Sequence, residues 1–229
     1  MAIRPVFVPG EKGNSFVDEI EIEFKWVPGM ASIQKKKNVV SLHQAAFLKG
    51  ISPVLEISTK SQIALGEELS AFNLQVKLPG MKPTSVEVAF QGSKVFQNGG
   101  PYHEFYAMTA REVRHDERLR NSGQLVGFNL NGDEWGLIPR TGFYDWLYLT
   151  ALEQNPSMGI HLLDFKGFTD IEFNPEKSIN CQARSAALYV SLLRNHLVGE
   201  AIQNKSSFIE IIQSGLSNSK NTAVQPTLF

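Results

Sequence analysis

The stretch VDEIEIEFKWV, residues 17–27, carries the clearest structural signal in the chain. Ile20, Ile22, Phe24 and Trp26 alternate with charged neighbours. A period of two places successive side chains on opposite faces of a β-strand, so the stretch predicts a strand with one buried face. This strand, followed by helical patterns, favours an α+β fold.

Further elements are predicted outward from this stretch. Short strands are expected at 52–58, 69–78 and 167–174, and a hairpin is expected around the Asn-Gly-Asp turn at 131–133. Helices are predicted over 38–50, 84–97, 103–121, 141–155, 156–165, 178–197 and 199–213. The prediction is a single helix-rich domain with a small, mainly antiparallel sheet weighted to the N-terminal half.

Composition limits the function classes. The chain has 229 residues, 42% of them hydrophobic and 20% charged, which is typical of one globular domain. A net charge of −1 provides no global field for nucleic acid, so any polyanion must bind at a local site. Cys181 is the only cysteine, which excludes an intramolecular disulfide, and its apolar surroundings predict a buried structural thiol. No signal peptide or membrane span is recognised, so a cytoplasmic protein is expected.

The stretch TSVEVAFQGSK, residues 84–94, allows two interpretations. Thr84 and Glu87 have the spacing of a capping box at a helix N-terminus. Alternatively, Glu87, Gln91 and Lys94 form a polar stripe on one helical face, beside apolar residues that include Phe90. The residues alone leave both open.

A second charged stretch, residues 103–121, also has two interpretations. It interleaves acids with Arg111, Arg114, Arg118 and Arg120. Alternating signs are typical of a solvated, salt-bridged face. One or two of these arginines could instead reach phosphate from a cleft.

The pattern Glu87-x-x-Phe90-Gln91-x-x-Lys94 resembles the central helix motif of the NADAR (YbiA-like) family. Other stretches resemble family motifs in the same order: LSAFNL at 69–74, KPTS at 82–85, TAREV at 109–113, FTDIEFN at 168–174 and SINCQARSAALYVSLLR at 178–194. The likeness spans about residues 66–197. Three departures are Ala71, where the family has Asn, Lys82, near the place of the family's tryptophan before the central helix, and Phe173-Asn174, where the family has Trp-Gly.

Residues 1–65 resemble the N-terminal extension of the branch encoded beside DarT-type DNA ADP-ribosyltransferase toxins. The resemblance implies an extension at 1–65 packed on a YbiA-like catalytic core at 66–213. A mobile polar tail is expected at 214–229, where Ser, Asn, Thr and Gln accumulate.

The resemblance also implies a function. NADAR proteins are N-glycosidases, and the toxin-linked branch removes ADP-ribose from guanine in DNA and so serves as the antitoxin. The implied partners are single-stranded DNA ADP-ribosylated on guanine, ADP-ribose as product and a cognate DarT-like toxin as genetic partner. Neither a metal nor a redox cofactor is implied.

Roles follow for residues that match the family's motifs. Lys94 is expected to attack the anomeric carbon and form a Schiff base, and Glu87 to shuttle protons, with Asp170 as a second possibility. Substrate binding is expected from Ser70, Phe72, Asn73 (near the departure at Ala71), Phe90, Gln91, Arg111 and Asn180.

Two alternatives belong to other functional classes. The first is a non-catalytic protein that binds ADP-ribose or the toxin itself, which would not need an amine on the pocket floor. The second is an N-glycosidase that acts on a free ribosylamino metabolite, which would not need a surface that contacts DNA.

Overall fold

A mixed four-stranded sheet organises the larger part of the molecule. The computed structural model describes residues 1–10, 15–176 and 178–219. The strand order is β2 (Val17–Phe24), β1 (Ala2–Pro9), β9 (Gly167–Thr169), β3 (Val54–Glu56). Strand β1 is antiparallel to β2 and β9, and β3 is parallel to β9. The sheet therefore joins the predicted N-terminal extension to a strand of the predicted core.

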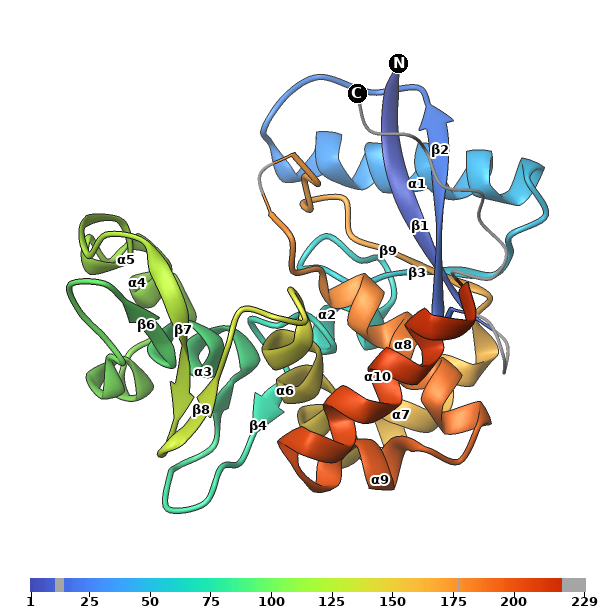
Figure 1. The fold of residues 1–229 in the computed structure, drawn as a ribbon. Coiled ribbons are helices and arrows are strands. Elements are labelled where there is room, and N and C mark those ends of the chain that lie inside the picture. The colour runs from blue at the N-terminus through green and yellow to red at the C-terminus, as the bar shows by residue number, and fades with distance from the viewer. Residues whose placement is uncertain (11–14, 177, 220–229) are drawn as a thin grey trace, which may run out of the picture.

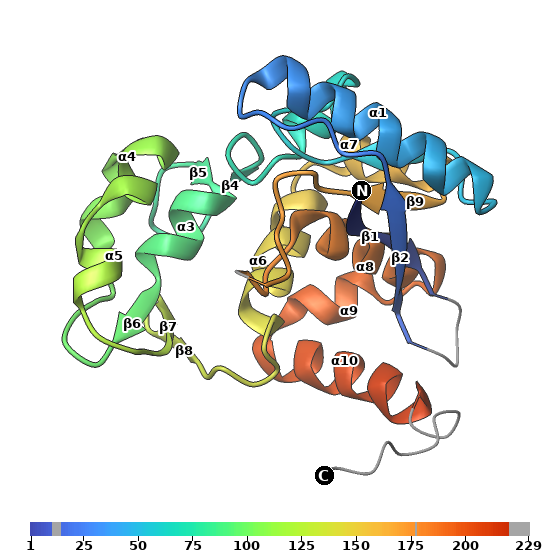
Figure 2. The same cartoon turned by 90° about the horizontal axis from the view of Figure 1, so that it is seen from above.

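Helices cover both faces of this sheet. Helix α1 (Ser32–Leu48) lies against one face and α8 (Gln182–Arg194) against the other (Figures 1 and 2). Successive side chains of β1 point to opposite faces of the sheet. Val6 therefore packs with the buried residues of α1, and Phe7 packs with the main core on the α8 side.

The remaining elements of this larger lobe surround the main core. They are α2 (Ala64–Glu68), β4 (Gln75–Val76), β5 (Thr84–Ser85), α6 (Gly142–Glu153), α7 (Pro156–His161), a 3₁₀ turn (Leu162–Asp164), α9 (Val198–Gln203) and α10 (Lys205–Ser219). Helix α6 contacts both α8 and α3, so it lies at the junction with the rest of the chain.

Residues 86–135 form a second, small lobe beside the first (Figures 1 and 2). It contains α3 (Val86–Gly92), β6 (Lys94–Phe96), a 3₁₀ turn (His103–Ala107), α4 (Ala110–His115), α5 (Arg118–Asn121), β7 (Leu125–Leu130) and β8 (Asp133–Trp135). Strands β6, β7 and β8 form an antiparallel sheet in that order. The predicted hairpin is confirmed, with Asn131 and Gly132 at positive φ between β7 and β8.

The predicted α+β class with small, mainly antiparallel sheets is confirmed. Strand β2 and helix α6 also lie where they were predicted. Four other predictions were wrong. The single helix predicted over 84–97 ends at Gly92. Residues 69–78 are mostly turn, because the Asn73 and Leu74 N–H groups both donate to the Ser70 carbonyl. Residues 103–121 break at Asp116, which is extended, and 199–213 break at Asn204.

The C-terminal segment is only partly described. Residues 214–219 continue α10, and the rest of the predicted tail, 220–229, lies outside the described residues. In the part of the chain that the structure describes, no helix is both long and apolar enough to cross a membrane.

The N-terminus of α3 differs from the predicted capping box. Ser85 is the N-cap residue, and its Oγ accepts a hydrogen bond from the Val88 N–H at 3.3 Å. Thr84 pairs with Val76 in β5, and its hydroxyl makes no hydrogen bond within the described part of the chain. Glu87 therefore has no partner in a capping box and its carboxylate is free for another role.

Ser85→Ala should destabilise the protein. Losing an N-cap typically lowers the free energy of unfolding by about 0.5–2 kcal/mol. For a chain of this length, each kcal/mol lowers Tm by roughly 2–4 °C. The neighbouring Thr84→Val variant, which loses an unbonded hydroxyl, is the control and should melt close to wild type. A larger loss in Thr84→Val than in Ser85→Ala would contradict this assignment.

Candidate active site

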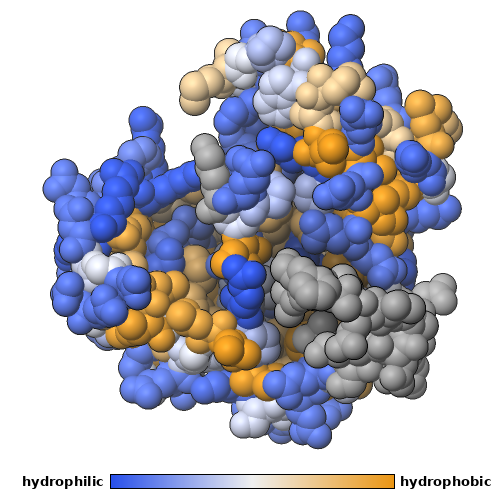
Figure 3. All heavy atoms as spheres, turned by 45° about the horizontal axis from the view of Figure 1, so that its top comes forward, coloured by the Kyte–Doolittle hydropathy of each residue, from blue (hydrophilic) through white to orange (hydrophobic). Residues whose placement is uncertain are grey.

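A cavity of about 480 Å³ lies between the two lobes. The small lobe contributes residues of α3, β6 and α4, and the larger lobe contributes the segments around residues 58, 71, 144, 170 and 180. Figure 3 shows this face of the molecule hollowed between the lobes, with hydrophilic residues along much of the rim. Polar groups thus converge on a partly open cavity, as in a site for a polar ligand.

Lys94 lies on the wall of this cavity that belongs to the small lobe. Helix α3 ends at Gly92, so Lys94 is the first residue of β6, where it pairs with Phe128. The predicted single helix over 84–97 was therefore wrong. The three residues of the predicted polar stripe still lie close together, because Glu87, Gln91 and Lys94 all line the cavity.

The Lys94 side chain is half-buried, and its amine lies near an aromatic ring and a carboxylate. Its Nζ is 4.9 Å from the centre of the Phe90 ring and makes no hydrogen bond or ion pair with any described residue. Burial lowers the pKa of Lys94, and the nearby Glu87 carboxylate partly opposes that shift. A neutral amine, which is nucleophilic, is thereby made more accessible.

Glu87 and Gln91 are neighbours on α3. Gln91 Nε2 donates to Glu87 Oε1 at 3.0 Å, and the Glu87 N–H donates to the Ala71 carbonyl at 2.8 Å. The buried Gln91 Oε1 has no hydrogen-bond partner among the described residues. An unpaired buried acceptor is costly, so this oxygen is suited to accept a hydrogen bond from a ligand.

Asp170 faces the same cavity from the larger lobe, where β9 ends. Its Oδ1 accepts hydrogen bonds from the N–H groups of Glu172 (2.9 Å) and Phe173 (3.2 Å), and its Oδ2 accepts one from Gln182 Nε2 (3.0 Å). Burial and the Glu56 carboxylate raise the pKa of Asp170 to about 8. At neutral pH the group is therefore a carboxylic acid and can donate a proton.

Gln182 joins three segments of the cavity wall. Its Oε1 accepts a hydrogen bond from the Ala71 N–H at 2.6 Å, and its Nε2 donates to the Ile57 carbonyl at 2.6 Å as well as to Asp170. Sequence reasoning missed this residue, although it lies in the stretch 178–194 that carried a family likeness.

The sequence analysis named Arg114 only as one of four arginines that could reach phosphate, and the family likeness selected Arg111 instead. Arg114 lies at the cavity with its guanidinium 5.4 Å from the Phe72 ring centre. Arg111, the predicted ligand, is exposed on α4, and Asn73 is exposed and donates to the Glu67 carbonyl. Neither is among the described residues that line the cavity.

Most of the predicted site is brought together. The predicted residues that line the cavity are Ser70, Phe72, Glu87, Phe90, Gln91, Lys94, Asp170 and Asn180. Cys181 is buried and unpaired, as predicted, and burial raises the pKa of its thiol well above the ordinary value. Within the described ranges, no three His, Cys, Asp or Glu side chains are grouped so that they could hold a metal ion.

A family model described as DarT1-associated NADAR antitoxin matches residues 2–222. The chain belongs to this family. A search of curated proteins found no match. The NADAR match covers both lobes and all residues that line the cavity, including Ser58 and Thr59 from the predicted extension.

Lys94→Met should raise the Tm of this NADAR protein. The methionine keeps the side-chain length and removes a partly desolvated amine that makes no hydrogen bond with a described residue. Because the folded-state pKa of Lys94 is lowered, the folded protein binds fewer protons than the unfolded chain, so wild-type stability rises with pH. The gain should thus be largest at low pH and shrink as pH rises toward about 10.4, the usual lysine value.

Thermal melts at several pH values test this, with the exposed Lys82→Met as the matched control. A Lys94→Met protein less stable than wild type at pH 6 would show that the amine contributes to folding.

Proposed function

We propose that this protein is an N-glycosidase that removes ADP-ribose from guanine in single-stranded DNA and thereby acts as the antitoxin of a DarT-type toxin. The observation that carries the proposal is the half-buried Lys94 amine, which lies near the Glu87 carboxylate, has no hydrogen-bond partner among the described residues and shares one cavity with Asp170, whose pKa is raised to about 8. A protein that only bound ADP-ribose would gain nothing from this amine. The membership in a DarT1-associated antitoxin family supports the choice of substrate.

The first step breaks the bond to the base. The lone pair of the neutral Lys94 amine attacks the anomeric carbon of the ribose, and the bond from that carbon to the guanine nitrogen breaks. Asp170, as the acid, gives its proton to the departing nitrogen. Glu87 takes a proton from the Lys94 nitrogen, which becomes a neutral glycosylamine.

The second stage releases the sugar. The Lys94 nitrogen lone pair forms a C=N bond as the ribose ring oxygen leaves the anomeric carbon and takes the proton that Glu87 received in the first step, giving a protonated Schiff base. Water then adds to that carbon, and the ionised Asp170 takes a proton from it, which restores the acid form of Asp170. Expulsion of the Lys94 amine leaves ADP-ribose and the free enzyme.

Binding groups are available around the reacting centre. Arg114, beside Phe72 at the cavity, is the guanidinium that we assign to the pyrophosphate, in place of Arg111. Asn180 and the unpaired Gln91 Oε1 are assigned to ribose hydroxyl groups. Because Phe72 stands next to Arg114, its ring is suited to stack against a base.

Borohydride trapping tests the covalent step. Reduction of a Schiff base during turnover of a single-stranded oligonucleotide with ADP-ribosylated guanine should leave a stable adduct on Lys94, detected by peptide mass spectrometry. Lys94→Ala should give neither adduct nor released ADP-ribose, and Lys82→Ala should behave as wild type. An active Lys94→Ala protein would overturn the mechanism. Turnover of a free ribosylamino metabolite without any on DNA would overturn the substrate.

Glu87→Gln should separate proton transfer from structure. The new amide oxygen can still accept from Gln91 Nε2, so the Tm should stay near that of wild type. The single-turnover rate should fall by about 10²–10⁴, the usual loss when a general acid–base is removed. The exposed Glu68→Gln is the matched control and should retain full activity. A Glu87→Gln protein as fast as wild type would place both proton transfers on Asp170.

A further inference from the structure

Glu56 is a buried carboxylate that lies outside the proposed reaction. It ends β3 and is 1% exposed. Its Oε1 accepts hydrogen bonds from Ser58 Oγ (2.6 Å) and the Ile171 N–H (2.8 Å), and its Oε2 accepts one from Thr169 Oγ1 (2.7 Å). Thr169 and Ile171 are the two residues that flank Asp170, so one carboxylate holds the backbone on both sides of the proposed acid.

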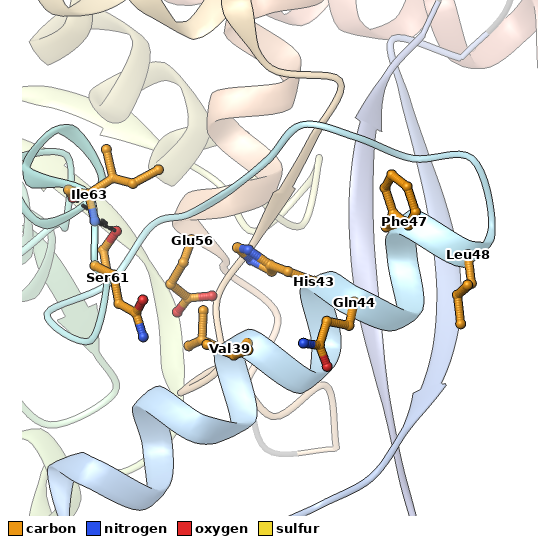
Figure 4. A pocket seen from close by; sticks show the side chains of 10 residues that line it. Val39, His43, Gln44, Phe47, Leu48, Glu56, Ser61 and Ile63 are labelled. Carbon is orange, nitrogen blue, oxygen red and sulfur yellow. Dashed lines mark hydrogen bonds between the residues drawn. The ribbon is translucent and has the colours of Figure 1, made fainter.

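His43 completes this arrangement from α1. Its Nε2 is 2.8 Å from Thr169 Oγ1. Because the Thr169 hydroxyl gives its only proton to Glu56, it accepts from the His43 N–H. Burial lowers the pKa of His43 to about 4, so the ring is neutral. Figure 4 shows His43 and Glu56 pointing toward each other in a groove of about 510 Å³ between α1 and residues 61–63.

The charges around Asp170 leave Glu56 as its main electrostatic neighbour. Glu56 faces it from β3, Tyr144 and Tyr148 face it from α6, and Cys181 faces it from the start of α8. The two phenols and the thiol are neutral at pH 7, because burial raises their pKa values. Glu172, in Asp170's own turn, is paired with Lys35 from α1.

Glu56 and Asp170 interact as two buried carboxyl groups, and such a pair retains one proton because a second negative charge is disfavoured. Each group accepts three hydrogen bonds from the protein, and burial raises the pKa of both. The Glu56 charge adds to the shift of Asp170 and brings its pKa to about 8, so the shared proton resides on Asp170, which borders the cavity.

We propose that Glu56 is a positioning residue: its carboxylate fixes the backbone around Asp170 and its charge keeps Asp170 in the acid form that protonates the leaving base. This inference rests on the proposed function, because it gives Asp170 that role. It assigns Glu56 no contact with substrate.

Glu56→Gln tests the charge. The side chain keeps its size, its oxygen can accept from Ser58 and the Ile171 N–H, and its amide can donate to a reoriented Thr169 hydroxyl. Without the neighbouring charge, Asp170 should ionise at lower pH. The basic limb of the single-turnover rate against pH should therefore move down by about one pH unit or more.

Thr169→Val is the matched control, because it loses a hydrogen bond to Glu56 but leaves the Glu56 charge in place. It should lower Tm while leaving the basic limb where the wild type has it. An unmoved limb in Glu56→Gln, or an equal movement in both variants, would reduce Glu56 to a structural role and overturn the inference.

A measurement without substrate separates this inference from the proposed function. A ¹³C NMR titration of the Asp170 carboxyl carbon should give a midpoint near pH 8 in the wild type, and a lower one in Glu56→Gln. If Glu56→Gln fails to fold, the wild-type titration alone still tests the inference, because a midpoint near pH 4 for Asp170 would overturn it. If the proposed function is wrong and this inference is right, the wild-type protein will release no ADP-ribose, but the midpoint of the Asp170 titration will still lie near pH 8.

Discussion

The three hydrogen bonds of the Gln182 side-chain amide are the contacts on which the candidate site depends. They join the end of β3 at Ile57, the turn at Ala71 and the carboxyl group of Asp170. An amide can satisfy all three only in one orientation, since its acceptor and its donors are on different atoms. The wall of the larger lobe is thereby fixed, and through the Glu87 N–H, which donates to the Ala71 carbonyl, the small lobe is fixed to it.

The two carboxyl groups of the site lie in different surroundings, and this difference fits the separate roles proposed for them. Glu87 stands in the first turn of a short helix and is bound by a neighbouring amide. Asp170 is buried next to a second carboxylate, which favours its neutral form. An acid and a base in one cavity, with an amine between two lobes, match the requirements of cleaving a bond between ribose and a base.

The sequence predicted features that depend on neighbours along the chain. The alternation in 17–27 and the Asn-Gly turn at 131–132 specify β2 and the β7–β8 hairpin by local rules. Motif likeness located Lys94, although the helix assigned to it ends two residues earlier. Glu56 and Gln182 could not be found in this way, because most of their partners are more than a hundred residues away in sequence. Arg111 and Arg114 lie on the same helix, so only the packing of α4 beside Phe72 shows that Arg114 is the one that lines the cavity.

The long range of these contacts has a consequence for how the molecule is made. Strand β3 is synthesised early and α8 late, and β3 reaches its neighbour β9 only after the whole small lobe has left the ribosome. Contacts between distant parts of a chain form slowly, because closing the intervening loop costs entropy. The cleft is therefore among the last features to assemble. A chain interrupted before residue 182 would lack the amide that closes it, however well its earlier segments had folded.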